Sequence, residues 1–177
     1  MPTLEKITEN LINQNIHRAA ADVFKIMLER AIEPVAAVEA DPVMPWPAPQ
    51  AAPEPETPLI IGQVGYAGAV CGVAFIYFEL PFAHECVCKL LGVTPQELDE
   101  LGHDAIKDAI GELTNMTVGS FKNGLCDAGY PCKLTIPAVF SVVDFKVAAK
   151  STAKRYTHVF NSLGRRLVID VLMKAED

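Results

Sequence analysis

The sequence is poor in positive charge. Its 177 residues include 15 Lys and Arg against 22 Asp and Glu, which leaves a formal net charge of −7. Proteins that bind nucleic acid neutralise phosphates with clustered Lys and Arg, so this balance argues against a nucleic-acid partner. The N-terminus has no basic stretch followed by an apolar run, and we therefore expect no secretion signal.

The sequence also lacks the cysteine pattern of a disulfide-stabilised protein. It has 5 cysteines, an odd number at irregular spacing, whereas disulfide frameworks use even sets. Reduced thiols are the simpler interpretation, and they predict a cytoplasmic protein. At this length one domain can bury a sufficient core without covalent cross-links, so we expect a single domain over residues 1–177.

A convincing metal-ligand pattern is missing as well. His84, Cys86 and Cys88 form an H-x-C-x-C run, and zinc favours these side chains. On a helix, residues 84 and 88 share a face while residue 86 points elsewhere, so one ion would not reach all three. We therefore predict no metal site here and interpret the two cysteines as small packing residues.

One long uncharged run is present, at residues 59–78. Its length would allow a membrane-spanning helix, which needs about 20 apolar residues. Four glycines and many β-branched and aromatic residues favour strands instead, and no Lys or Arg lies close enough to orient a membrane helix. We predict two buried strands, at about 59–66 and 69–79, joined near Ala67 and Gly68, and no membrane span.

Four segments carry apolar residues at the three- and four-residue steps of a helix. Prolines in the first turn and glycines after the last mark several of their ends. The sequence Thr94-Pro-Gln-Glu97 is the sharpest signal, because it has the spacing of a capping box. The predicted helices are residues 3–32, starting at Thr3 and ending before Pro34, residues 81–91, a short helix after Thr94, and residues 103–123, ending at Gly124.

After Pro131 the apolar residues alternate, which is typical of strands. The predicted strands are residues 134–140, 145–149, 156–160 and 166–174, with turns near 150–151 and 161–164. Short turns without crossover helices imply a largely antiparallel sheet. Helices dominate the first part of the chain and strands the last, so the predicted fold class is α+β, with the helices packed on the sheet.

Residues 42–58 differ from the rest of the chain. Seven of these 17 residues are proline, and they include Trp46, the only tryptophan. Such a segment predicts an extended surface loop or insertion. Two interpretations stay open: the segment docks on an aromatic groove of another protein, or Trp46 packs against its own domain.

The helix predicted at residues 103–123 has two distinct faces. A helical wheel gathers an apolar stripe on one side, made of Ile106, Ala109, Ile110, Leu113, Met116 and Phe121. The opposite side carries Asp108, Glu112, Asn115, Gly119 and Lys122. Glu112 and Asn115 stand one turn apart on this exposed face, and Gly119 leaves a shallow place that another surface could approach.

The stretch DAIGELTNMTVGSFKNGL around these residues resembles the CheX/CheC family of chemotaxis phosphatases. The family motif is an Asp or Ser, three residues, Glu, two residues, Asn, and a proline a little over twenty residues later. Asp108, Glu112, Asn115 and Pro137 take these places, with the proline one residue nearer than usual. CheC-like members carry two such motifs, whereas Glu112 is the only glutamate here with Asn at the third following position. The single motif indicates the CheX type.

The resemblance implies a phosphatase whose substrate is a phosphorylated CheY-type response regulator. It assigns catalysis to Glu112 and Asn115 and a bordering docking surface to Asp108, Gly119 and Lys122, with Pro137 as a structural residue. It implies no tightly bound cofactor, because Mg²⁺ comes with the phosphorylated partner, and it implies a homodimer formed through sheet edges. The alternative is a CheX-like binding module that docks a regulator or another signalling protein without catalysis.

Overall fold

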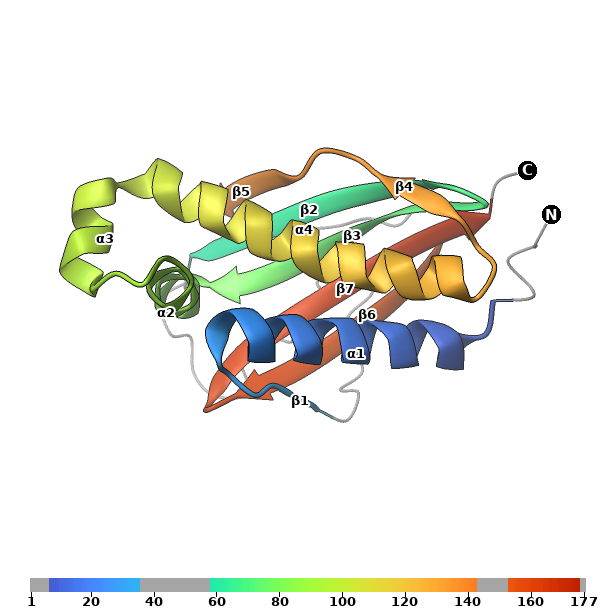
Figure 1. The fold of residues 1–177 in the computed structure, drawn as a ribbon, viewed down its shortest axis with the longest axis horizontal. Coiled ribbons are helices and arrows are strands. Elements are labelled where there is room, and N and C mark those ends of the chain that lie inside the picture. Colours follow the sequence, from blue (N-terminus) through green and yellow to red (C-terminus); the bar gives the residue numbers. More distant parts are fainter. Residues whose placement is uncertain (1–6, 36–57, 143–152, 176–177) are drawn as a thin grey trace.

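The computed structural model describes residues 7–35, 58–142 and 153–175. The described strands form one seven-stranded sheet in the order β1-β6-β7-β3-β2-β4, and β5 also pairs with β2. Helices α1 and α4 lie side by side across one face of this sheet (Figure 1). The pairings between the described strands are antiparallel, which confirms the predicted α+β fold with an antiparallel sheet. The proline-rich segment and Trp46 lie outside the described residues, apart from Pro58.

The uncharged run forms two adjacent strands, as predicted. Strands β2 (Leu59–Gly68) and β3 (Val70–Glu79) pair in antiparallel register, with Ile60 opposite Phe78. The connection lies slightly later than expected, between Gly68 and Val70. In the described part of the chain, no helix is long and apolar enough to cross a membrane.

The short helices match the sequence signals that predicted them. Helix α2 (Leu80–Leu91) has Pro81 in its first turn and ends at Gly92, whose φ of 68° is left-handed. Helix α3 (Pro95–Leu101) begins with the complete capping box between Thr94 and Glu97.

Helix α1 is shorter than the predicted 3–32 and spans Glu9–Leu28. It starts after Thr8, whose hydroxyl accepts a hydrogen bond from the Leu11 amide at 3.2 Å, so the predicted cap at Thr3 is wrong. It ends at Glu29, which takes a left-handed φ of 48° several residues before Pro34. The two-residue strand β1 (Glu33–Pro34) then pairs with β6.

Helix α4 (His103–Asp127) is longer than predicted, because Gly124 does not end it. A Cβ at Gly124 would overlap the Asn15 side chain of α1 and lie 2.6 Å from its Cγ. The glycine therefore permits a close crossing of α1 and α4 and is no stop signal. The helix continues to Asp127, and Gly129, with a φ of 92°, follows in the turn.

The strand predicted at residues 134–140 is two strands, β4 (Cys132–Leu134) and β5 (Ala138–Val142). Both pair with β2, and the break between them is at residues 135–137. Thr135 ties this break to β2, since its amide donates to the Gly65 carbonyl at 2.8 Å and its hydroxyl accepts from the Gly65 amide at 2.9 Å. The strands β6 (Lys154–Ser162) and β7 (Arg165–Ala175) form the predicted closing hairpin. The strand predicted at 145–149 and the turn near 150–151 fall outside the described residues.

Helix α1 contacts β6 partly through His17 and His158, whose Nε2 and Nδ1 atoms lie 3.2 Å apart. Burial, with a smaller contribution from His17, lowers the pKa of His158 to about 4. The ordinary histidine pKa is about 6.5. Between these two pKa values the unfolded chain binds a proton at this histidine and the folded protein does not. The free energy of unfolding therefore falls as the pH drops from about 6.5 to about 4.

We expect the titration of His158 to lower the free energy of unfolding by on the order of 3 kcal/mol as the pH falls through this range. Urea unfolding at pH 7 and at pH 4.5 would measure the loss, and His158→Gln should reduce it. An equal loss in the parent and in His158→Gln would contradict the assignment.

Candidate functional site

The exposed face of α4 carries the residues singled out in the sequence. Asp108 and Glu112 are exposed, and Asn115 is half-buried one turn after Glu112. Gly119 and Lys122 continue the same face and are also half-buried. The arrangement follows from helical spacing, since steps of three and four residues return to one side of the helix.

The buried side of α4 holds polar residues that the wheel did not place there. Thr114 and Thr117 are fully buried, and their hydroxyls donate to the carbonyls of Ile110 at 2.7 Å and Leu113 at 2.9 Å. Because these bonds stay within the helix, the hydroxyls need no partner from the sheet. Met116, predicted to be in the buried stripe, is only partly buried.

Two close contacts place the β4–β5 connection alongside α4. A Cβ on Gly111 would lie 3.4 Å from Val139, and one on Gly119 would lie 3.8 Å from Leu134. The intervening residues 135–138 therefore run beside the turn of α4 that carries Asn115. This brings the half-buried Pro137 to the predicted face, although it is more than twenty residues from Glu112 in the sequence.

Ile136, next to Pro137, is a residue that sequence reasoning missed. Its side chain is 90 % exposed, which is unusual for a large apolar residue. The proline after it and the paired Thr135 before it hold its backbone beside α4. The alternating pattern of residues 134–140 concealed it, because alternation predicts one continuous strand and not an exposed break.

Two polar side chains of this face have no hydrogen-bond partner among the described residues. In the part of the chain that the structure describes, neither Glu112 nor Asn115 makes a side-chain hydrogen bond or ion pair. Lys122 donates from Nζ to the neighbouring Asn123 Oδ1 at 3.1 Å. An unbonded carboxylate and amide one turn apart can bind a cation and orient a water molecule, respectively.

Glu112 and Asn115 lie outside the two large cavities that the described residues form. Two cavities of about 690 and 720 Å³ lie elsewhere, one between α1 and β6 and the other beside α2 and α3. The residues that line these two cavities include neither Glu112 nor Asn115. A convex helix face with free polar groups fits the surface of a macromolecule better than a small ligand, which needs concave burial.

Metal ligands are not gathered at this face. Across residues 7–35, 58–142 and 153–175, no three His, Cys, Asp or Glu side chains are grouped so that they could hold an ion together. In the H-x-C-x-C run, Cys86 is buried, whereas His84 and Cys88 are partly exposed.

Comparisons with known proteins agree with the fold and with the resemblance to the CheX/CheC family. The family described as chemotaxis phosphatase CheX matches residues 60–161, which include α4 and Pro137. No curated protein matches the sequence.

Solved structures of similar fold cover nearly the whole chain. A CheC-like superfamily protein from Shewanella sp. PV-4 is 26% identical with a TM-score of 0.72, over 96% of this chain and 100% of that one. The chemotaxis protein CheX from Vibrio vulnificus is 22% identical with a TM-score of 0.70, over 92% and 96% of the two chains. A CheX from Borrelia burgdorferi, solved as a CheX–CheY–BeF₃–Mg²⁺ complex, is 17% identical with a TM-score of 0.67, over 92% and 97%. Since the family match spans more than half of the sequence, the chain belongs to the CheX family.

Proposed function

We propose that this protein is a phosphatase that hydrolyses the aspartyl phosphate of a CheY-type response regulator in chemotaxis signalling. The observation that carries the proposal is the pair Glu112 and Asn115, one turn apart on the outer face of α4, whose side chains form no hydrogen bond or ion pair with any other described residue. The Borrelia burgdorferi structure, in which a CheX is bound to CheY, supports the choice of partner.

Asn115 is the residue that acts on the attacking water. An aspartyl phosphate needs a water in line with the phosphorus more than it needs covalent chemistry. The Asn115 amide both donates and accepts hydrogen bonds, so it can fix such a water without adding charge. A carboxylate at this position would repel the phosphoryl oxygens.

Glu112 holds the two proteins in register. Its exposed carboxylate pairs with a lysine in the phosphorylation pocket of the regulator, one helical turn from the water bound by Asn115. Mg²⁺ stays with the regulator and neutralises the phosphoryl charge there. Asp108, Gly119 and Lys122 border the docking surface, and Pro137 fixes the neighbouring β4–β5 connection.

The protein acts as a cytoplasmic homodimer joined through sheet edges. Strand β6 pairs with β7 along one edge, and on its other edge β1 covers only Phe160 and Asn161 in register. Among the described strands, this other edge is therefore unpaired toward Lys154. Such an edge is a natural place for pairing with a second chain. Light scattering coupled to size-exclusion chromatography would test the dimer, and a purely monomeric mass would contradict it.

Phosphate release from a phosphorylated CheY-type regulator, with and without this protein, tests the activity. We expect release to accelerate in proportion to the amount of protein. Binding without acceleration would replace the proposal by the non-catalytic docking module, and absence of both would contradict both functions.

Glu112→Ala should weaken docking and turnover together. A charge-assisted pair contributes about 1.5–3 kcal/mol, so we expect the dissociation constant for the phosphorylated regulator to rise by roughly tenfold or more. Titration of a fluorescent regulator measures this. Glu100→Ala removes an exposed carboxylate from α3 and is the control for net charge. Equal affinities in Glu112→Ala and Glu100→Ala would exclude the docking role.

A further inference from the structure

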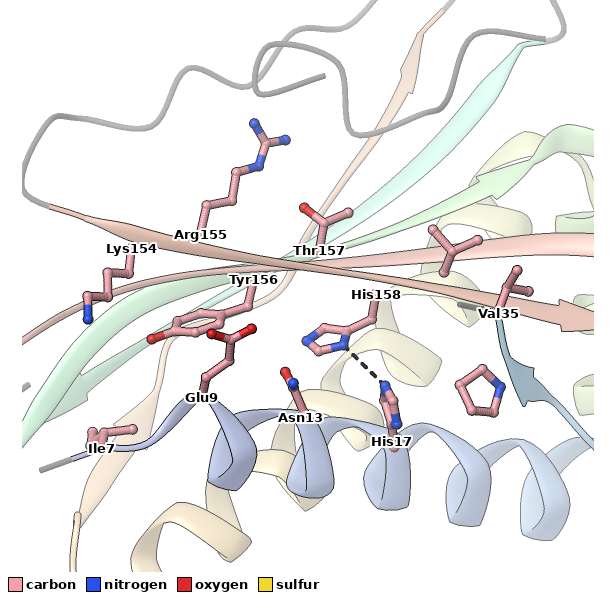
Figure 2. Close-up of a pocket in the computed structure, with 12 residues that line it drawn as sticks. Ile7, Glu9, Asn13, His17, Val35, Lys154, Arg155, Tyr156, Thr157 and His158 are labelled. Atoms are coloured by element: carbon pink, nitrogen blue, oxygen red, sulfur yellow. Dashed lines mark hydrogen bonds between the residues drawn. The ribbon is translucent and has the colours of Figure 1, made fainter. Parts of the chain in front are cut away.

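A second group of chemically active side chains lies between α1 and β6, away from the face of α4. His17 on α1 and His158 on β6 point toward one another across this space (Figure 2). Their ring planes are 86° apart, with centroids at 5.1 Å. Both rings line a cavity of about 690 Å³, as do Glu9 and Asn13 of α1 and Tyr156 of β6.

The two facing nitrogens have the separation of ligands that share one metal ion. Zinc lies about 2.0–2.1 Å from a histidine nitrogen. Two such nitrogens stand about 2.9 Å apart at a right angle and about 3.3 Å apart at a tetrahedral angle. His17 Nε2 and His158 Nδ1 form a hydrogen bond at 3.2 Å, and this separation also lies within the range of two ligands on one ion. A helix and a sheet strand supply the two rings, so the spacing is set by rigid elements.

We propose that His17 and His158 bind one divalent transition-metal ion of the kind that favours imidazole, such as Zn²⁺. Asn13 and Glu9 precede His17 at four-residue steps, so their oxygens lie on the same side of α1 and face β6 (Figure 2). They can form hydrogen bonds with metal-bound water. Because no third His, Cys, Asp or Glu is grouped with the pair in the described residues, water fills the remaining positions and the ion exchanges readily.

Charged groups of both signs surround the pair of rings. In the hydrogen bond between the two rings one of the facing nitrogens carries a proton, so an ion that binds both nitrogens displaces that proton. The carboxylate of Glu9 adds negative charge at the cavity, whereas the exposed Lys154 and the Arg155 guanidinium add positive charge. Figure 2 shows Arg155 on the other side of β6 from the two rings. Its positive charge therefore repels an ion bound between the rings only weakly.

Titration with Zn²⁺ alone, and with Co²⁺ as a spectroscopic probe, tests the site in the full-length protein. We expect one ion per chain, a rise in melting temperature with Zn²⁺, and a Co²⁺ spectrum of nitrogen and oxygen ligands. His17→Gln should weaken binding by about tenfold or more, since loss of even an outer-shell partner of a metal ligand costs about 10–100-fold in affinity. The double variant His84→Gln/His103→Gln removes the other histidines and should bind as the parent does.

The proposal is overturned if no saturable one-to-one binding occurs, or if His17→Gln binds as tightly as the parent. An intense thiolate-to-cobalt band would overturn it too, because it would place the ion at the cysteines. His158 is nearly fully buried and its variants risk misfolding, so the decision rests on the partly exposed His17.

Discussion

Asn115→Ala should bind the phosphorylated regulator almost as well as the parent but lose its ability to release phosphate. The side chain is half-buried on the outer face of α4 and makes no side-chain hydrogen bond within the described residues, so its removal disturbs little of the fold. Losing the group that orients the attacking water should lower the maximal rate on the order of 10²-fold. Single-turnover phosphate release at saturating phosphatase measures this step apart from binding.

A matched variant separates this effect from general damage to α4. Asn123→Ala removes the same kind of side chain from an exposed position two turns later. It should leave both binding and turnover near those of the parent. If Asn115→Ala releases phosphate as fast as Asn123→Ala does, then Asn115 does not position the water and the proposed mechanism fails.

Gly62→Ala should be among the most damaging single substitutions on β2. A Cβ at this position would overlap the Thr114 hydroxyl and lie 2.8 Å from Thr114 Cβ. Thr114 is fully buried and bonded to the Ile110 carbonyl, so it cannot turn away without losing that bond. Overpacking of a buried contact costs about 1–3 kcal/mol, and the lost hydrogen bond adds to it. We expect the free energy of unfolding, measured with urea, to fall by roughly 3 kcal/mol.

Two further variants identify the cause. Thr114→Ala, combined with Gly62→Ala, removes the overlapping hydroxyl and should restore part of the stability. Gly119→Ala lies on α4 itself, where an added Cβ would meet only Leu134 at 3.8 Å, and it should leave stability unchanged or raise it. A Gly62→Ala protein that unfolds at the same urea concentration as the parent would show that α4 does not rest on β2 as described.

Local signals predicted the parts of the fold that depend on neighbouring residues. The capping box at Thr94 and the glycine at position 92 placed the ends of α2 and α3 within a residue or two. Helical spacing put Glu112 and Asp108 on the exposed side of α4. These features are set within one or two turns of chain, and the sequence contains all the groups involved.

Contacts between distant segments account for the errors. Gly124 has the appearance of a helix stop, but its function is to admit Asn15 of α1, and nothing near it in the sequence shows that. Thr114 and Thr117 are polar, yet their own helix satisfies their hydroxyls and lets them be buried. The break at Pro137 and the exposure of Ile136 depend on the pairing of Thr135 with Gly65, which lies seventy residues earlier. Pro137 could be identified only from the family motif, because no local pattern in the sequence distinguishes it.

The glycine content of α4 means that the helix, and the site on it, form only within the folded domain. Its interior includes Gly111, Gly119 and Gly124, and each glycine costs about 1 kcal/mol of intrinsic helix propensity relative to alanine. A free peptide with this sequence should be largely unstructured in water, because packing supplies most helical stability in proteins. The spacing that joins Glu112 to Asn115 therefore exists only once the helix has docked on the sheet. A fragment that contains α4 without the sheet should therefore be inactive. For the same reason, transfer of the short motif alone to another protein should not transfer the site.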